Sequence, residues 1–430
     1  MLDKARHASM DTAVGENIYE EVLHLAERHC GKGLTSRYLR DQKKARRREK
    51  QVLQELPGPE RRYAPLTPEQ NPDDVTSIDH LLTMCRDTLP TDKQYQNVLI
   101  DVGNILKLHA EYGPAEKMFT DVLSYGRAQK CNELIVEALL QRGDIFSRQG
   151  RWKESGRDLR TARDLASRLG DLVALARTSN ILGTSDAEQG DLTRAKRQFV
   201  KALGCAERAK RESLEAVILM NLGVVHNIIG DYDEAFAYYR RALSRFERTG
   251  EINRIAEIHH NTGMTHLSRG EYMEALRSFD QSIHFAVRTG DQRLAGISQL
   301  EKATIHFKTR DHALALALCN SALEQFKHTS DRLGTADAYK VKGMILREMK
   351  EYDPAMTFFQ SSLRINEEYN NRLNQGETHY EIGIMQQSRR KWKEAVAAFK
   401  SAKVCFKRVG ACPELEKTEN RLKQLKERSK

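Results

Sequence analysis

Apolar and polar positions repeat every forty residues along most of the chain. In the stretch 211–250, apolar side chains recur three and four residues apart over 213–229 and again after Tyr232, which predicts two amphipathic helices. Gly230 and Gly250 follow these helices and suit a left-handed helix end. A fixed period of about 20 to 50 residues is typical of a solenoid built from one repeated helical unit.

Small residues and rings keep the same period. Glycine occupies one position of the predicted first helix in seven of eight copies, and Ala303 replaces it in the other. A missing side chain lets two helices cross closely, and a neighbouring ring fills the groove. We therefore predict that the glycine of the first helix and the alanine of the second mark such a crossing. The glycines are Gly103, Gly143, Gly183, Gly223, Gly263, Gly343 and Gly383, the alanines are Ala115, Ala195, Ala235, Ala275, Ala315, Ala355 and Ala395, and the rings are Phe119, Phe199, Tyr239, Phe279, Phe359 and Phe399.

Two copies depart from this pattern. The second copy has Ser155 and Leu159 at the alanine and ring positions, and the sixth has Ala303, His312 and Cys319 at the corresponding places. We expect the packing to differ most in the sixth copy.

The repeated motif resembles the tetratricopeptide repeat. Its clearest copy contains Asn221-Leu222-Gly223, Gly230-Asp231-Tyr232-Asp233-Glu234-Ala235, Tyr239 and Ala242-Leu243. The next copy contains Asn261-Thr262-Gly263, Gly270-Glu271-Tyr272-Met273-Glu274-Ala275 and Phe279. The usual unit has about 34 residues, and the longer form here is similar to the repeats of polarity adaptors, kinesin light chains and Rap-type peptide receptors.

The resemblance implies an all-α fold, a right-handed α-solenoid of eight tandem helix pairs over residues 91–410. We predict a capping helix over 75–90 and another over 411–430, the latter with one apolar stripe and a polar outer face. Five prolines lie between 57 and 72, so residues 1–74 are interpreted as a basic, helical or partly disordered arm with a proline-rich linker.

The positive charge of the chain is concentrated in that arm. Residues 31–50 hold nine lysines and arginines against two acids, whereas the whole chain carries a net charge of +10. Such a segment could bind an acidic protein, an anionic surface or nucleic acid, or act as a nuclear import signal in a eukaryote. No aromatic residue lies between Lys43 and Leu56, so we do not expect single-stranded nucleic acid to stack there. We favour a solvated helix, with an acidic protein partner as the next interpretation; the basic residues are Lys43, Lys44, Arg46, Arg47, Arg48 and Lys50.

The remaining composition argues against several classes of function. The sequence contains no nucleophile elbow, no zinc-protease motif and no phosphate-binding loop. Its seven cysteines are scattered without a Cys-x-x-Cys pair, so neither zinc nor a disulfide framework is expected. No run of eighteen apolar residues and no apolar leader is present. We expect a cytoplasmic protein with reduced thiols that has no enzyme activity, cofactor or membrane span.

Three histidines, His226, His266 and His306, lie in register in successive copies. They could form a metal ladder or a pH sensor. Neighbouring helices lie about 8–10 Å apart, which is too far for three such rings to converge on one ion. We therefore favour the interpretation that each ring fills a packing slot.

In relatives with this repeat, the first helices line a concave groove that binds ligands. The resemblance places positions three before, one after and four after each repeat glycine in that groove. We expect its middle to be apolar with amides and its later part to be cationic, where Lys340 and Arg347 could hold a carboxylate. The predicted groove residues are Asn180, Thr184, Met220, Val224, Asn227, His260, Met264, Thr304, Phe307, Lys340, Met344 and Arg347.

A co-chaperone role is not expected from these positions. Chaperone-binding relatives grip a C-terminal carboxylate with lysines and asparagines. Here the first two copies have Ile100, Asn104, Leu140 and Asp144 instead, so the lysines are missing and Asp144 has the wrong charge.

The leading hypothesis is a scaffold or adaptor that binds an extended segment or a helix of a partner protein in the groove. One alternative is a regulator switched by a peptide or partner, similar to Rap-type proteins. Another is a docking subunit of a cytoskeletal or axonemal assembly, anchored by the basic helix. The sequence leaves the identity of the partner open.

Overall fold

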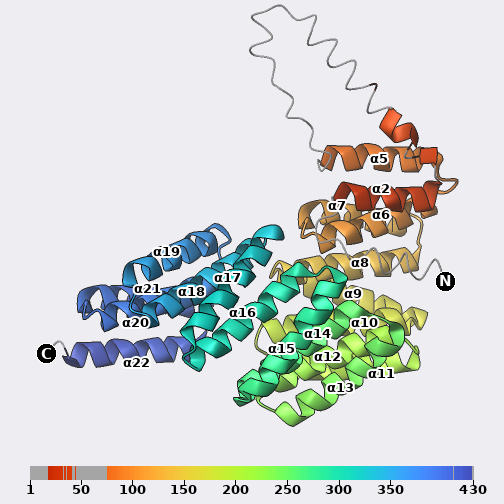
Figure 1. Ribbon diagram of the computed structural model, residues 1–430. Helices are drawn as coiled ribbons and strands as arrows, with labels where there is room; N and C mark the ends of the chain where they lie inside the picture. Colours follow the sequence, from red (N-terminus) through yellow and green to blue (C-terminus); the bar gives the residue numbers. More distant parts are fainter. Residues whose placement is uncertain are drawn as a thin grey trace, which may run out of the picture. The chain divides into compact units, whose positions relative to one another are not determined.

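The chain folds into α-helices (Figure 1). The computed structural model describes residues 18–31, 33–34, 36–40, 44, 75–409 and 411–428, and this part of the chain contains no strand. The described residues belong to two compact units, Gly15–Ile229 and Gly230–Lys430, called here the N-terminal and C-terminal units. The all-α prediction is therefore confirmed.

The N-terminal unit starts with a helix pair ahead of the repeats and continues with repeat helices that pack on their chain neighbours. Its helices are α2 (Ile18–Cys30), α5 (Val75–Thr88), α6 (Asp92–Leu108), α7 (Tyr112–Ala128), α8 (Asn132–Arg148), α9 (Trp152–Leu169), α10 (Leu172–Glu188), α11 (Leu192–Arg208) and α12 (Glu212–Ile229).

The C-terminal unit continues the same order of helices and ends in the helix predicted as a cap. Its helices are α13 (Tyr232–Thr249), α14 (Ile252–Arg269), α15 (Tyr272–Thr289), α16 (Gln292–Lys308), α17 (His312–His328), α18 (Arg332–Glu348), α19 (Tyr352–Glu368), α20 (Arg372–Ser388), α21 (Trp392–Val409) and α22 (Cys412–Arg428). Within this unit α14 packs on α15, α16 on α17, α18 on α19 and α20 on α21, which is the helix-pair packing of a tetratricopeptide solenoid.

Five of the repeat glycines lie directly against the ring of the second helix in their own pair, and they are Gly103, Gly183, Gly263, Gly343 and Gly383. A Cβ atom added to Gly343 would lie 2.6 Å from Cε1 of Phe359, and one added to Gly103 would lie 2.7 Å from Cζ of Phe119. Both rings are fully buried. The predicted close crossing is confirmed at these sites, and the ring leaves no room for a side chain on the first helix.

The two irregular copies keep the crossing with other side chains. In the second copy, Leu159 lies where the ring would be, and Ser155 donates a hydrogen bond to the backbone oxygen of Gly143 at 2.8 Å. In the sixth, Ala303 and Cys319 are both fully buried. The expected difference is therefore small, because a smaller pair of side chains fills the same contact.

Residues 18–31, 33–34 and 36–40 belong to the N-terminal unit and contribute to its core. Val22 and Leu25 of α2 are buried, as is Tyr38, and α2 packs against both α5 and α6. Two histidines join α2 to α6: His29 Nε2 lies 2.9 Å from Asp101, and His109 Nε2 lies 2.9 Å from Glu21. The hydrogen bond to Glu21 raises the pKa of His109. This part of the predicted arm is thus packed on the first repeat.

The basic run falls largely outside the described residues. Lys44 is described and is exposed, whereas Lys43, Arg46, Arg47, Arg48 and Lys50 lie outside the described part. The role predicted for this run remains a prediction.

Among the described helices, α12 is long and apolar enough to cross a membrane by length and composition alone. It has 18 residues with a mean hydropathy of 1.3, and half of that window is buried inside the protein. A buried core helix of a repeat has the same properties, so this helix is weak support for a span.

We predict that Gly343→Ala lowers the free energy of unfolding by about 1–3 kcal/mol, the usual cost of overfilling a packed core. The new methyl group must displace the buried Phe359 ring. Gly204→Ala in α11 is the matched control, because Gly204 is exposed and an added Cβ meets nothing within 4 Å. That variant should gain about 0.5–1 kcal/mol. Urea unfolding followed by circular dichroism measures both, and equal shifts would contradict the packing argument.

Candidate functional site

A cavity of about 530 Å³ lies among α16, α18, α20 and α22 of the C-terminal unit. This volume falls in the range of about 300–1,000 Å³ that is typical of ligand sites. One part of its wall is apolar, and its residues are Ile297, Leu300, Phe307, Phe326, Val341, Met344 and Phe406. The other part is polar, with Glu301, Thr304, Asp337, Lys340, Asn374, Glu377, Tyr380, Glu381, Glu414 and Lys417.

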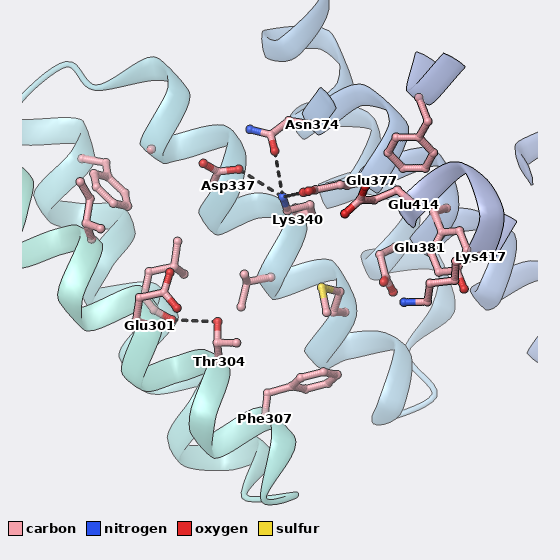
Figure 2. A pocket seen from close by; sticks show the side chains of 18 residues that line it. Glu301, Thr304, Phe307, Asp337, Lys340, Asn374, Glu377, Glu381, Glu414 and Lys417 are labelled. Atoms are coloured by element: carbon pink, nitrogen blue, oxygen red, sulfur yellow. Dashed lines mark hydrogen bonds and ion pairs between the residues drawn. The ribbon is translucent and has the colours of Figure 1, made fainter. Parts of the chain in front are cut away.

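Four of the predicted groove residues meet in this cavity. Thr304 and Phe307 come from α16, and Lys340 and Met344 come from α18. Figure 2 shows Glu301, Thr304 and Phe307 along α16, across the cavity from the Lys340 cluster. The Thr304 hydroxyl donates a hydrogen bond within its own helix to the Leu300 carbonyl at 3.1 Å. A ligand would therefore meet the Thr304 methyl group and the Phe307 ring.

Lys340 is held by three side chains inside the cavity (Figure 2). Its Nζ lies 2.5 Å from Glu377 Oε2, 3.2 Å from Asn374 Oδ1 and 3.3 Å from Asp337 Oδ1. Burial lowers the pKa of Lys340, but the two carboxylates outweigh that effect and hold the pKa above its ordinary value. An ammonium group has three hydrogens to donate. Glu377 and Asn374 accept two of them in hydrogen bonds, and Asp337 adds an ion pair.

Arg347 is paired in the same way. Its side chain is only 8% exposed and forms ion pairs with Glu381 of α20 and with Glu348. The expectation of a cationic later groove, with Lys340 and Arg347 free to hold a carboxylate, is therefore wrong. The acids that neutralise them lie mainly on the next first helix.

The cavity as a whole is acidic. Five carboxyl side chains and two lysines line it, which leaves an excess of three acids, or two when Arg347 beside Glu381 is counted. Lys417 lies over the ring of Tyr380, with its Nζ 4.9 Å from the ring centroid. Glu301 forms no hydrogen bond or ion pair with any described residue, and burial raises its pKa.

Two buried polar atoms in the wall have no hydrogen-bond partner among the described residues. They are the hydroxyl of Tyr380, a residue that is 6% exposed, and Oδ1 of Asp337. The Asp337 oxygen lies 3.3 Å from Lys340 Nζ without hydrogen-bonding geometry, and burial raises the pKa of its carboxyl group. Buried polar groups normally find partners, so these atoms are available to a ligand.

The two predicted groove residues of α14 lie outside this cavity. His260 Nδ1 lies 3.0 Å from Ser298 Oγ, which in turn lies 2.9 Å from Ser282 Oγ. Burial lowers the pKa of His260 to about 4, so the ring is neutral at pH 7. Ser298 is fully buried, so this serine and histidine act as core polar groups. Met264 packs against the apolar cluster of α15.

The predicted residues of the N-terminal unit lie on α10 and α12. Asn180 accepts a hydrogen bond from Asn221 at 2.9 Å, and Thr184 donates to the Asn180 carbonyl at 3.2 Å. Met220 is buried, and Val224 and Asn227 are half-buried. The Asn227 side-chain oxygen is buried without a partner among the described residues.

Oppositely charged side chains also pair between neighbouring first helices of the N-terminal unit. Lys107 Nζ lies 2.7 Å from Asp144 Oδ2 and 2.5 Å from Gln141 Oε1, and Arg177 lies 2.7 Å from Glu137. Lys107 occupies the position four after its repeat glycine, which differs from the positions of Ile100 and Asn104, so the expectation against a co-chaperone role stays a prediction. Like Lys340, this lysine is already paired.

Three of these pairs join residues that lie slightly less than one repeat apart in the sequence. Lys107–Asp144 and Lys340–Glu377 are both 37 residues apart, and Arg347–Glu381 is 34 residues apart. These separations are three or six residues shorter than the forty-residue repeat. They place the two side chains next to each other on adjacent first helices. Opposite charges at these separations in the sequence could therefore have predicted that acids pair with Lys340 and Arg347.

The in-register histidines have local roles. His266 Nδ1 lies 2.6 Å from Glu271, and its ring packs on Phe236, while His306 lies 3.9 Å from Asp311. No group of three histidine, cysteine or acidic side chains in the described part of the chain is placed to hold a metal ion.

We predict that Glu301→Gln stabilises the protein at neutral pH. Because burial raises the folded-state pKa of Glu301, its ionised form costs free energy above that pKa, and the cost disappears as the pH falls below the unfolded value of 4.5. The variant should gain on the order of 1 kcal/mol at pH 7.5 and nothing near pH 4. Urea unfolding at both pH values measures the difference. A variant less stable than the parent at pH 7.5 would contradict the burial argument.

Solved structures with a similar fold are known. One is a Rap protein complexed with competence and sporulation factor, 13% identical with a TM-score of 0.54 over 77% of this chain and 98% of that one. Another is the Rap conjugation gene regulator of plasmid pLS20 in complex with the Phr* peptide, 16% identical with a TM-score of 0.55 over 79% and 90%. A third is aspartyl phosphate phosphatase F from Bacillus subtilis, 13% identical with a TM-score of 0.57 over 77% and 89%. At these identities the likeness concerns the fold alone.

Sequence comparison identifies the family directly. No curated protein matches the chain significantly. A family model for the tetratricopeptide repeat matches residues 134–208, 214–285 and 294–368, which together make up about half of the chain. Those matches agree with the glycines and aromatic rings that recur every forty residues and with the paired helices. The chain belongs to the tetratricopeptide repeat family.

Proposed function

We propose that the protein is a non-enzymatic interaction adaptor that binds an extended segment or a helix of a partner protein on the first helices of its C-terminal unit. The observation that carries this proposal is the cavity among α16, α18, α20 and α22, which combines an apolar wall with unpartnered buried polar atoms. A peptide supplies both apolar side chains and backbone donors. The protein works in this proposal without a cofactor, in the cytoplasm.

The similar folds favour a peptide as the ligand. Two of them are described as complexes with competence and sporulation factor and with the Phr* peptide. Within the N-terminal unit, the buried side-chain oxygen of Asn227 can by itself accept a hydrogen bond from a peptide backbone.

A regulator switched by its ligand is the second candidate. The packing of α2 on α5 and α6 favours it, because a helical segment ahead of the repeats is docked through the histidine pairs of His29 and His109. The docking-subunit alternative depends on the basic residues 43–50. Reversing the charges of Arg46, Arg47 and Arg48 would abolish binding in that alternative and leave it intact in the leading proposal.

We predict that Thr304→Trp abolishes peptide binding. The indole would fill the cavity, since Thr304 lines it and its hydroxyl bonds only within its own helix. Thr357→Trp is the matched control, because Thr357 makes the same intrahelical bond at 3.2 Å on the exposed face of α19. A random peptide display library is selected on the full-length protein, and the selected peptides are measured on both variants by fluorescence anisotropy. Peptides that bind the Thr304→Trp protein as tightly as the parent would contradict the proposed site.

A further inference from the structure

We infer that the partner segment recognised by this cavity inserts a lysine or arginine side chain, flanked by apolar side chains, against Glu301 and Asp337. The inference rests on the proposed function and names the chemistry of its ligand. It reverses the expectation that Lys340 and Arg347 would hold a carboxylate.

The balance of charge in the cavity favours a cation as the ligand. The cavity wall contains five carboxyl groups and two lysines, and both lysines are already engaged. Lys340 donates to Asn374 and Glu377 and lies in an ion pair with Asp337, while Lys417 lies over the Tyr380 ring. A ligand carboxylate would have to displace Glu377 from Lys340, and the displaced acid would then lie unpaired in a half-buried site. That exchange gains no ion pair.

Acceptors remain for a cation. Glu301 lines the cavity and forms no hydrogen bond or ion pair with a described residue. The hydroxyl of Tyr380 and Oδ1 of Asp337 make no hydrogen bond there, although this Asp337 oxygen lies in an ion pair with Lys340. A guanidinium or ammonium group supplies only donors, which these oxygens lack. Its arrival would also remove the cost of the unpaired Glu301 carboxylate, whose pKa is raised by burial.

Apolar side chains line the cavity together with these acids. Leu300 and Phe307 flank Glu301 on α16, and Val341 and Met344 lie on α18. Lysine and arginine bury their methylene stems against such surfaces while the charged group reaches a polar site. A small free cation would leave this wall uncovered. A peptide with leucine beside arginine covers it, so a protein segment fits the cavity better than a polyamine.

The test uses three short fluorescent peptides, capped at both ends, with a central Leu-Arg-Leu, Leu-citrulline-Leu or Leu-Glu-Leu sequence. Citrulline keeps the shape of arginine and removes its charge. We expect the arginine peptide to bind the full-length protein at least about tenfold more tightly than the citrulline peptide, as one additional ion pair in a half-buried site requires. The glutamate peptide should bind most weakly.

Glu301→Gln decides whether the cavity causes this preference. The preference for arginine over citrulline should fall to about twofold in that variant, while the affinity for the citrulline peptide stays unchanged. Glu416→Gln is the matched control, because Glu416 is exposed on α22 and does not line the cavity. Since Glu301→Gln is expected to be the more stable protein, lost binding cannot be attributed to unfolding. Equal preferences in the parent and in Glu301→Gln, or tighter binding of the glutamate peptide, would overturn the inference.

Other occupants of the cavity give different results. If Arg46→Ser/Arg47→Ser/Arg48→Ser strengthens binding of the arginine peptide, the chain's own basic segment competes for the cavity and the assignment to another protein is overturned. If the arginine peptide converts a dimer to a monomer in light scattering, the occupant is a second copy. If spermidine displaces the peptide at equal concentration, the apolar wall contributes nothing.

Failure of this inference differs from failure of the proposed function. Display-selected peptides that lose binding in Thr304→Trp but contain no lysine or arginine would leave the adaptor function standing and overturn the cationic anchor. Absence of any peptide sensitive to Thr304→Trp would overturn both.

Discussion

The contact between the repeat glycine of one helix and the ring of the next fixes the rest of this structure. At Gly343, a Cβ atom would lie 2.6 Å from the Phe359 ring, so the two helices can cross only where the side chain is missing. This crossing sets the rotation of each first helix, and with it the residues that face the neighbouring first helix. Lys340 then lies 2.5 Å from Glu377, because both helices are fixed in the same register.

The repeat made much of the fold predictable. A forty-residue period predicts the helix pairs and their close crossings. The positions one and four after each repeat glycine then predict that Thr304, Phe307 and Met344 line one groove. The burial of Val22 and Tyr38 was not predicted, because these residues lie ahead of the repeats and the forty-residue pattern assigns them no packing position. The charge of the cavity was also mispredicted, because Lys340 was considered without the acid 37 residues later.

That error has a physical lesson for repeat proteins. A cation on one first helix is a site for anions only if the next repeat leaves it unpaired, and here each of the two cations has a carboxylate partner. The charge that remains after pairing is instead negative. Glu301 lines the cavity without a partner among the described residues, and Asp337 shares the single charge of Lys340 with Glu377. The hydroxyl of Tyr380, which also lines the cavity, makes no hydrogen bond there. The binding chemistry of such a groove therefore depends on the charges that remain after neighbouring repeats have paired, and in this chain those favour a cation.

The most direct measurement is a crystal structure of the full-length protein with the Leu-Arg-Leu peptide bound. The account predicts that the guanidinium group lies within about 4 Å of the Glu301 and Asp337 carboxylates, with a leucine side chain against Phe307 and Met344 and the Lys340–Glu377 pair intact. A peptide bound outside the cavity among α16, α18, α20 and α22, or one that breaks the Lys340–Glu377 pair with its own acidic group, would contradict it.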